Sequence, residues 1–195
     1  GCGKGLVVFL GGVVGGRKSS ERGVGMGANV TSVDRSLDGL RRGDNQFGNR
    51  IQTLYSTQDA VEEMAMKADL IIGAVLIPGA SAPKLITRDA VKSMSSGTAM
   101  VDVAIDQGGC FETSHATTHD EPTYIVDDVV HYCVANMPGA VARTSAAALN
   151  NATLPYVLAL ANHGIFCALR NDPHLMNGLN VHEGKITNKF VAAAH

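Results

Sequence analysis

The sequence predicts an α/β fold built on a doubly wound parallel sheet, followed by a linking helix and part of a second domain. Short apolar runs alternate with helix-type segments through the first two-thirds of the chain, which is typical of βαβ crossovers in a parallel sheet. After Gly139 the strand-type runs stop and a stretch rich in Ala and Leu begins. We therefore expect a sheet domain over residues 1–142 and the linking helix and partial domain over residues 143–195.

Six short apolar runs are the expected strands. The run at residues 69–76 is continuously apolar, as expected for a strand that is buried on both faces of a sheet. The expected strands cover residues 6–10, 29–34, 50–55, 69–76, 98–105 and 129–134. The intervening segments predict helices over residues 36–47, 58–67 and 88–94.

Capping residues support two of these helices. Ser56 or Thr57 precedes the second helix and Thr87 precedes the third, where a hydroxyl oxygen can accept a hydrogen bond from a free backbone amide. In the C-terminal part, we expect a helix over residues 143–163 that ends at Gly164 and kinks at Pro155. The more polar tail is expected to form short helices and loops.

A cluster of glycines follows the first strand, where dinucleotide-binding folds of the Rossmann type carry G-x-G-x-x-G. Gly12 and Gly15 supply the second and third glycines, but the first would fall on Leu10. A literal match at residues 23–28 precedes a strand, so we reject it. Residues 17–23 lack an apolar face, which predicts a poor crossover helix.

Asp34 ends the second expected strand, about 20 residues beyond the glycine turn. An acid at this place can accept hydrogen bonds from the adenine-ribose hydroxyls and repel a 2′-phosphate, which favours NAD over NADP. The alternative is that Asp34 is only a turn residue at the end of its strand.

Polar and glycine-rich loops follow three later strands, at residues 73–79, 103–110 and 134–140. Cofactor and substrate gather beyond the carboxyl ends of strands in such sheets. Asp106 follows a buried strand directly and is our candidate general acid and base. The alternative for Asp106 is a helix cap or turn acid.

Other reactive side chains are assigned to the scaffold. We expect no metal site, because the candidate ligands lie in a loop without a further ligand pair; they are Cys110, His115, His119 and Asp120. His131 is expected to be a hydrogen-bonded core histidine, and Cys110 has no evident base that would make it a nucleophile.

Composition excludes several classes of protein. The formal net charge is −2, so no basic excess predicts a nucleic-acid partner. No uninterrupted apolar run approaches the roughly 20 residues of a membrane span, so no membrane partner is expected. Four widely spaced cysteines without a CxxC motif favour free thiols and a cytoplasmic protein.

Several stretches resemble bacterial L-alanine dehydrogenase. They are residues 69–79 (DLIIGAVLIPG), 101–110 (VDVAIDQGGC), 131–141 (HYCVANMPGAV) and 148–157 (ALNNATLPYV). The resemblance implies reversible conversion of L-alanine, NAD and water into pyruvate, ammonia and NADH by a cytoplasmic homohexamer. It also implies that Asp106 is the catalytic acid and base. Implied cofactor contacts are Gly12, Gly15, Asp34, Ser56, Val75, Leu76, Val103, Ala104, Ile105, Asp106, Val134, Ala135, Asn136 and Met137.

Two departures from the family matter. Its substrate-binding Arg, Lys and His lie in an N-terminal domain that this sequence does not contain, so we expect an inactive fragment in which residues 143–195 belong to a split catalytic domain. The glycine turn is one residue short and residues 16–26 restore the spacing, which we interpret as two compensating reading-frame slips. The alternatives are a transhydrogenase-like NAD(H)-binding subunit and a non-catalytic nucleotide-binding module.

Overall fold

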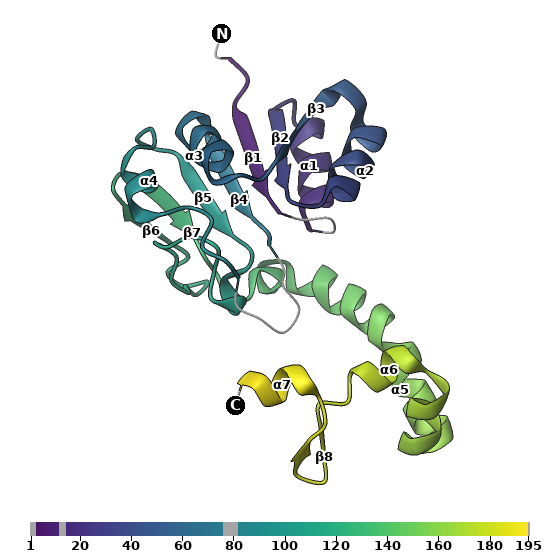
Figure 1. Cartoon of the computed structure of the whole chain (residues 1–195). Coiled ribbons are helices and arrows are strands. Elements are labelled where there is room, and N and C mark those ends of the chain that lie inside the picture. The colour runs from purple at the N-terminus through teal and green to yellow at the C-terminus, as the bar shows by residue number, and fades with distance from the viewer. Residues whose placement is uncertain (1–2, 12–14, 76–81, 195) are drawn as a thin grey trace. The chain divides into compact units, whose positions relative to one another are not determined.

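The computed structural model describes residues 3–11, 15–75 and 82–194 of the chain (Figure 1). The chain divides into two compact units, Gly1–Met137 and Pro138–His195. The first unit contains the sheet and the second begins just before a long helix.

A seven-stranded sheet with the order β3-β2-β1-β4-β5-β7-β6 forms the centre of the first unit. Its strands are β1 (Leu6–Leu10), β2 (Asn29–Asp34), β3 (Ile51–Tyr55), β4 (Leu70–Gly73), β5 (Ala99–Asp102), β6 (Thr123–Val126) and β7 (Val129–Tyr132). All neighbours pair in parallel except β6 and β7. The predicted α/β fold with a doubly wound sheet is therefore confirmed, and its strand order reverses between β1 and β4.

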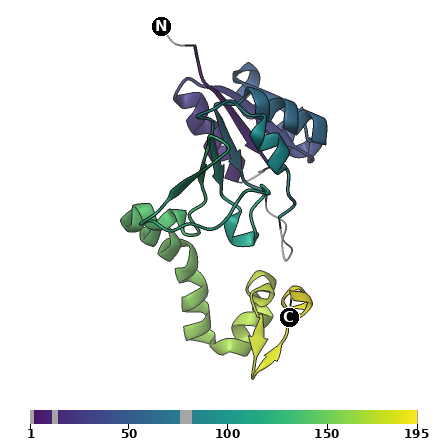
Figure 2. The ribbon, with the colours of Figure 1, turned by 90° about the vertical axis from the view of Figure 1, so that its left-hand side faces the viewer.

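Two pairs of helices cover the sheet (Figures 1 and 2). On one face lie α1 (Gly15–Gly25) and α2 (Leu37–Phe47), over a core of Phe9, Val30, Phe47 and Ile51. On the other face lie α3 (Gln58–Lys67) and α4 (Arg88–Lys92), over a larger core that includes Val8, Ile71 and Met100. Short 3-10 turns cover Gly48–Arg50, Ile105–Gln107 and Met137–Val141.

The crossover helix α1 corrects one expectation, because it forms in spite of its polar sequence. Ser20 is buried. A Cβ added to Gly23 would lie 3.0 Å from Val30 Cγ2 and 3.8 Å from Phe9 Cε2. Small side chains thus let the helix backbone approach the sheet closely, so α1 packs without the large apolar face that we looked for.

Strand β6 was not predicted. It pairs in antiparallel fashion with β7 through the turn at Asp127 and Asp128, whose φ angles are 49° and 62°. Two successive residues with positive φ are typical of the tight turns that join two-stranded hairpins. The sequence lacks the Asn-Gly or Asp-Gly signal of such a turn, so the hairpin went unnoticed.

Three predicted strands end earlier in the structure than in the prediction. Strand β4 ends at Gly73 and not at Leu76, β5 ends at Asp102 and not at Ile105, and β7 ends at Tyr132 and not at Val134. The described residues beyond these ends lie in loops, where Ala104, Ile105, Cys133 and Val134 are buried and Val103 is exposed. Apolar content alone therefore overestimates the length of a buried strand.

In the second unit, helix α5 (Ala142–Asn171) breaks at Gly164, where the sequence predicted its end, and a second helical part follows. Gly164 has φ 71° and ψ 162° and divides α5 into two helical parts. Pro155 lies inside the first part, where the backbone stays helical, so the expected kink at Pro155 is wrong. The remaining elements are α6 (Pro173–Asn177), β8 (Val181–His182), β9 (Lys185–Ile186) and α7 (Lys189–Ala194).

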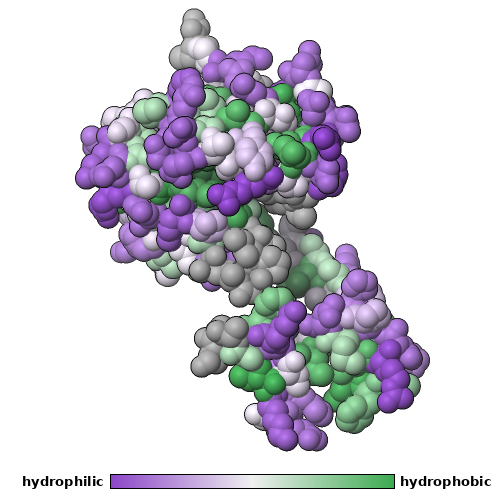
Figure 3. All heavy atoms as spheres, in the orientation of Figure 1, coloured by the Kyte–Doolittle hydropathy of each residue, from purple (hydrophilic) through white to green (hydrophobic). Residues whose placement is uncertain are grey.

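Helix α5 exposes much of its apolar surface. Leu149, Val157 and Phe166 are all exposed, and Phe166 is 71% accessible to solvent. Figure 3 shows hydrophobic side chains on the surface of this unit. By length and composition alone, Met137–Asn171 would suffice to cross a membrane, and no other helix in the described part of the chain does so. Helices that are covered by other parts of a soluble protein can have the same length and composition.

Candidate functional site

The carboxyl ends of the parallel strands meet at one edge of the sheet, and the strand order reverses there between β1 and β4. Open α/β sheets bind ligands in the crevice outside such a reversal. Gly11 ends β1 with φ 71°. A Cβ at Gly11 would lie 2.4 Å from Cγ2 and 3.0 Å from Cα of Val75, which follows β4. The turn after β1 and the loop after β4 therefore lie closer together than a side chain at position 11 would allow.

The next two strand ends bring together Asp34 and Ser56, which were both predicted to contact the cofactor. The Ser56 amide donates to the Asp34 carbonyl at 3.0 Å. One carboxylate oxygen of Asp34 accepts the Ser36 amide at 2.8 Å. Ser36 in turn caps α2 by accepting the Gly39 amide. The turn fixes the direction of the Asp34 side chain, and its second oxygen has no partner among the described residues.

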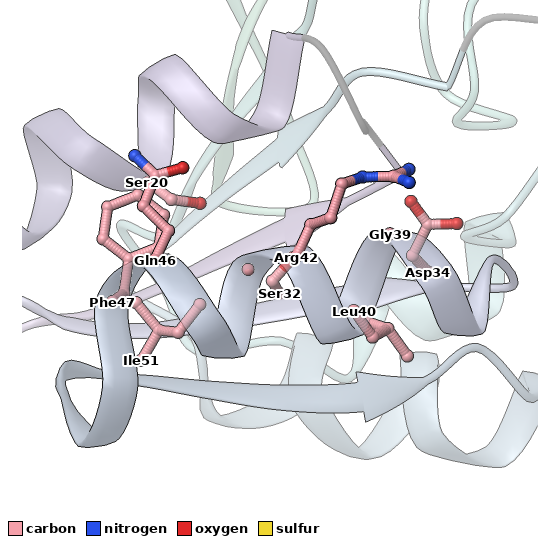
Figure 4. A pocket seen from close by; sticks show the side chains of 10 residues that line it. Ser20, Ser32, Asp34, Gly39, Leu40, Arg42, Gln46, Phe47 and Ile51 are labelled. Carbon is pink, nitrogen blue, oxygen red and sulfur yellow. The ribbon is translucent and has the colours of Figure 1, made fainter.

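A pocket of about 240 Å³ opens beside Asp34, between α1, α2 and the strands β2 and β3 (Figure 4). Asp34 and Arg42 line it together with buried Ser20 and half-buried Ser32. The pocket thus offers a carboxylate, a guanidinium and two hydroxyls at the end of β2. Its size and polar lining suit part of a nucleoside.

The loop after β5 holds four predicted cofactor residues. Val103 and Asp106 are exposed, whereas Ala104 and Ile105 are buried. The Val103 amide donates to the Gly73 carbonyl at 2.8 Å, which joins this loop to the end of β4. Asp106 lies in the 3-10 turn Ile105–Gln107 and not directly after the strand. Its carboxylate therefore faces solvent, where it can exchange a proton with a bound molecule.

Gln107 in the same loop and Asp102 at the end of β5 were not predicted from the sequence. Oε1 of Gln107 is buried and has no hydrogen-bond partner among the described residues. Asp102 is fully buried and accepts the amides of Ala104 at 3.1 Å and Cys110 at 2.9 Å. Its carboxylate also accepts the Ser114 hydroxyl at 2.5 Å. Position 102 shares the inward parity of buried Met100, and this signal could have identified it.

Cys110 is held as a thiol. Its Sγ donates to Asp102 Oδ1 at 3.3 Å. Burial, and next the charge and hydrogen bond of Asp102, raise the pKa of Cys110 well above its ordinary value. Since the thiolate is the reactive form, Cys110 is not an activated nucleophile.

The end of β7 carries the last group of predicted cofactor residues. Val134 is buried, Met137 is half-buried, and Ala135 and Asn136 are exposed. The Asn136 carbonyl lies 2.6 Å from His119 Nε2.

His131, in β7, is a hydrogen-bonded core residue as predicted. Its Nδ1 lies 3.0 Å from the Val129 carbonyl and its Nε2 lies 2.7 Å from Thr113 Oγ1. Burial lowers its pKa.

Gly15, Gly12 and Leu76 are the remaining predicted cofactor contacts. Gly15 begins α1, at the start of the described residues after the glycine turn. Gly12 and Leu76 lie outside the residues that the structure describes. Within the described residues, no group of three His, Cys, Asp or Glu side chains is placed to hold a metal ion.

Comparison with known proteins connects this geometry to a family. Residues 1–189 match the family described as alanine dehydrogenase/PNT, C-terminal domain. The chain belongs to this family. It is 58% identical over 188 residues to an alanine dehydrogenase of Halomonas elongata, and 53% identical over 186 residues to that of Mycolicibacterium smegmatis. These matches cover 96% and 95% of the chain.

Solved structures of the alanine dehydrogenase family agree with the fold. An L-alanine dehydrogenase superposes with a TM-score of 0.89 at 48% identity over 97% of the chain. A transhydrogenase from Sinorhizobium meliloti superposes with a TM-score of 0.66 at 24% identity over 74% of the chain and 42% of its own, which shows a shared fold alone. The chain spans about half of the alanine dehydrogenases it matches, namely 51%, 50% and 52% of their lengths.

Proposed function

We propose that the chain is the NAD(H)-binding part of an L-alanine dehydrogenase. The reaction converts L-alanine, NAD⁺ and water into pyruvate, ammonium, NADH and a proton. The observation that carries the proposal is the pairing of Gly11 with Val75 at the strand-order reversal, with Asp34 at the neighbouring strand end. Residues 1–142 form the cofactor domain in this proposal, and residues 143–195 contribute a linking helix and part of the catalytic domain.

The residues present fit a dinucleotide. Gly11 lets the turn after β1 approach the loop after β4, since a Cβ there would lie 2.4 Å from Val75 Cγ2, and glycines in this turn are typical of dinucleotide sites. Asp34 keeps one oxygen for a ribose hydroxyl because its other oxygen already accepts the Ser36 amide. The buried Oε1 of Gln107 has no donor among the described residues, and a ligand amide or amine can supply one.

Asp106 is the proposed acid and base. When bound, NAD⁺ supplies the hydride acceptor of the reaction. The exposed carboxylate of Asp106 would take a proton from the substrate amine or from the attacking water and return one in the reverse direction. Val103 and the loop at Ala135 and Asn136 would contact the cofactor and exclude water on either side of Asp106.

The first test is calorimetric titration of the chain with NADH and with NADPH. We expect NADH to bind and NADPH to bind more weakly, because Asp34 repels a 2′-phosphate. We expect no alanine-dependent NADH formation by the 195-residue chain. Fusion to the N-terminal half of the Halomonas elongata alanine dehydrogenase should create that activity, and Asp106→Asn should abolish it in the fusion.

Two outcomes would favour other functions. Binding of NADH together with an inactive fusion would favour a non-catalytic nucleotide-binding module. Transfer of hydride between two nucleotides without alanine would favour a transhydrogenase-like subunit. If NADH fails to bind, the glycine turn does not function, and the proposal is wrong.

The complete protein is proposed to be a cytoplasmic homo-oligomer, a hexamer by resemblance. The exposed side chains of α5, among them Leu149, Val157 and Phe166, support an interface. Polar Asn150, Asn151 and the break at Gly164 favour protein neighbours over lipid. Light scattering of the active fusion should give a multiple of its chain mass, and flotation with lipid vesicles should recover none of it.

A further inference from the structure

Two segments that follow neighbouring strands run side by side near Asp106. Residues 82–86 lie after β4, and residues 107–112 lie after β5. The amides of Ala82 and Leu85 donate to the carbonyls of Gln107 at 3.0 Å and Cys110 at 2.7 Å. In the other direction, the amide of Glu112 donates to the Ile86 carbonyl at 3.0 Å. The backbone of residues 82–86 therefore leaves the carbonyls of Gly108, Gly109 and Phe111 without a donor from this segment, although the Phe111 carbonyl also accepts the Ser114 amide at 3.2 Å.

Lys84 supplies those donors. Its Nζ lies 2.6 Å from the Gly108 carbonyl, 2.9 Å from that of Gly109 and 3.2 Å from that of Phe111. With the two backbone hydrogen bonds, all five successive carbonyls of residues 107–111 accept from residues 82–85. An ammonium has three donors and no acceptor, so this arrangement satisfies Lys84 fully.

The convergence of three carbonyls has a physical cost that only a cation or several donors can offset. Gly108 and Gly109 have φ angles of 89° and 73°, which turn successive carbonyls toward one point. Carbonyl oxygens that converge repel one another, and a charged donor replaces that repulsion with attraction. By contrast, Lys67 and Lys92 form ordinary surface pairs with carboxylates on their own helices.

The opposite side of the same loop is held by Asp102, which accepts the amides of Ala104 and Cys110. The loop therefore lies between a buried carboxylate that binds its amides and an ammonium that binds its carbonyls. Asp106 lies in the span between these attachments and is itself exposed.

We propose that Lys84 is a positioning residue that holds the loop bearing Asp106 against the segment after β4, so that two cofactor-contacting loops form one rigid unit. The importance of this loop for NAD(H) rests on the proposed function, whereas the rigidity of the loop does not. Loss of the ammonium should loosen residues 104–111 and leave the sheet intact, because the sheet core does not include Lys84.

Amide hydrogen exchange of the chain without cofactor tests the proposal. In Lys84→Met, amides of residues 104–111 should exchange at least about tenfold faster than in the parent chain, while those of β1 and β4 keep their rates. Lys84→Arg keeps a cation and should recover part of the protection. Lys92→Met is the matched control, and its loop should exchange like the parent. Unchanged exchange in Lys84→Met, or a uniform increase across the sheet, would overturn the proposal.

Titration with NADH gives the second measurement. Lys84→Met should raise the dissociation constant about fivefold, and Lys84→Arg should restore most of the affinity. Equal affinity of Lys84→Met and the parent would show that a loosened loop does not matter for the cofactor and would contradict the proposed positioning. If the parent does not bind NADH, the proposed function fails, and the exchange rates still decide whether Lys84 holds the loop.

Discussion

The carboxylate of Asp102 accepts the backbone amide of Cys110 at 2.9 Å, although the two residues are eight positions apart in the sequence. The same side chain accepts from Ala104 and Ser114, and it is fully buried. Asp102 is therefore the anchor of the loop that carries Asp106. Asp102→Asn should lower the free energy of unfolding by about 2–4 kcal/mol, because an amide NH₂ would face donors that need an acceptor. Urea unfolding measures the difference.

Asp106→Asn is the matched control for this experiment. Asp106 is exposed and lies in the same loop, so its substitution should change stability by less than about 0.5 kcal/mol. Of the two aspartates, Asp102 alone should contribute strongly to the free energy of unfolding. Equal effects of the two variants on unfolding would contradict the role given to Asp102.

Asp34 should set the choice between NADH and NADPH. In Asp34→Asn one oxygen remains to accept the Ser36 amide, so the turn should persist while the charge is lost. We expect NADH to bind about tenfold more weakly and NADPH to bind more tightly than before, which brings the two affinities close together. Fluorescence titration with both nucleotides measures this. Asp44→Asn on α2 should leave the ratio unchanged, and a preserved preference in Asp34→Asn would exclude the role.

Gly11 should tolerate no side chain. Its φ of 71° disfavours other residues, and a Cβ would meet Val75 at 2.4 Å. Gly11→Ala should cost about 2 kcal/mol or more in thermal unfolding and should also weaken NADH binding. Gly25→Ala is the control, because a Cβ there meets nothing within 4 Å at the end of α1. That variant should be neutral or slightly stabilising. Equal melting temperatures of Gly11→Ala and the parent chain would contradict the close approach of β1 and the loop after β4.

Sequence reasoning predicted the strands better than their ends. The bounds of β1 and β2 agree with the expectation, because each run is terminated by glycines or an acid. Strand β5 ends three residues earlier than predicted, since the apolar residues Val103, Ala104 and Ile105 lie in a loop and do not extend the strand. This difference matters for the site, because it places Asp106 on an exposed turn.

The sequence indicates the candidate site residues more clearly than the residues that hold the loops and helices of the site in place. Asp34 and Asp106 could be proposed from the sequence because each was expected to end or follow a strand, although Asp106 lies in a turn beyond the end of β5. Lys84 could not, since its role depends on carbonyls 24 to 27 residues away. Ser20 and Gly23 looked like defects in a helix, and only the packing on Phe9 and Val30 shows why small residues are needed there.

The cysteines should differ sharply in reactivity. Cys167 is exposed, whereas Cys110 and Cys133 are buried and burial raises the pKa of both thiols. Iodoacetamide should therefore modify Cys167 in the native chain and leave Cys110 and Cys133 unmodified until a denaturant is added. Mass spectrometry of peptides after short reaction times measures this. Rapid native alkylation of Cys110 would contradict its hydrogen bond to Asp102.

The pH dependence of stability should report His131. Because the Val129 carbonyl can only accept, Nδ1 of His131 carries the hydrogen and Nε2 accepts from Thr113 Oγ1. Burial lowers the pKa of His131, so the folded state binds its proton less readily than the unfolded chain does. Its contribution is therefore complete above the ordinary histidine pKa of about 6.5 and is lost as the pH falls below it.

Urea unfolding of the parent chain between pH 7 and about pH 5 should show stability that falls by up to about 1.4 kcal/mol per pH unit through this one group. His131→Gln should be less stable at pH 7, because the hydrogen bonds of the ring are lost, and its stability should decline less steeply on acidification. His174→Gln provides the control, since His174 is exposed and its variant should keep the slope of the parent. If His131→Gln keeps that slope as well, a group other than His131 accounts for the loss of stability in acid, because removal of the ring would otherwise have removed its proton linkage to folding.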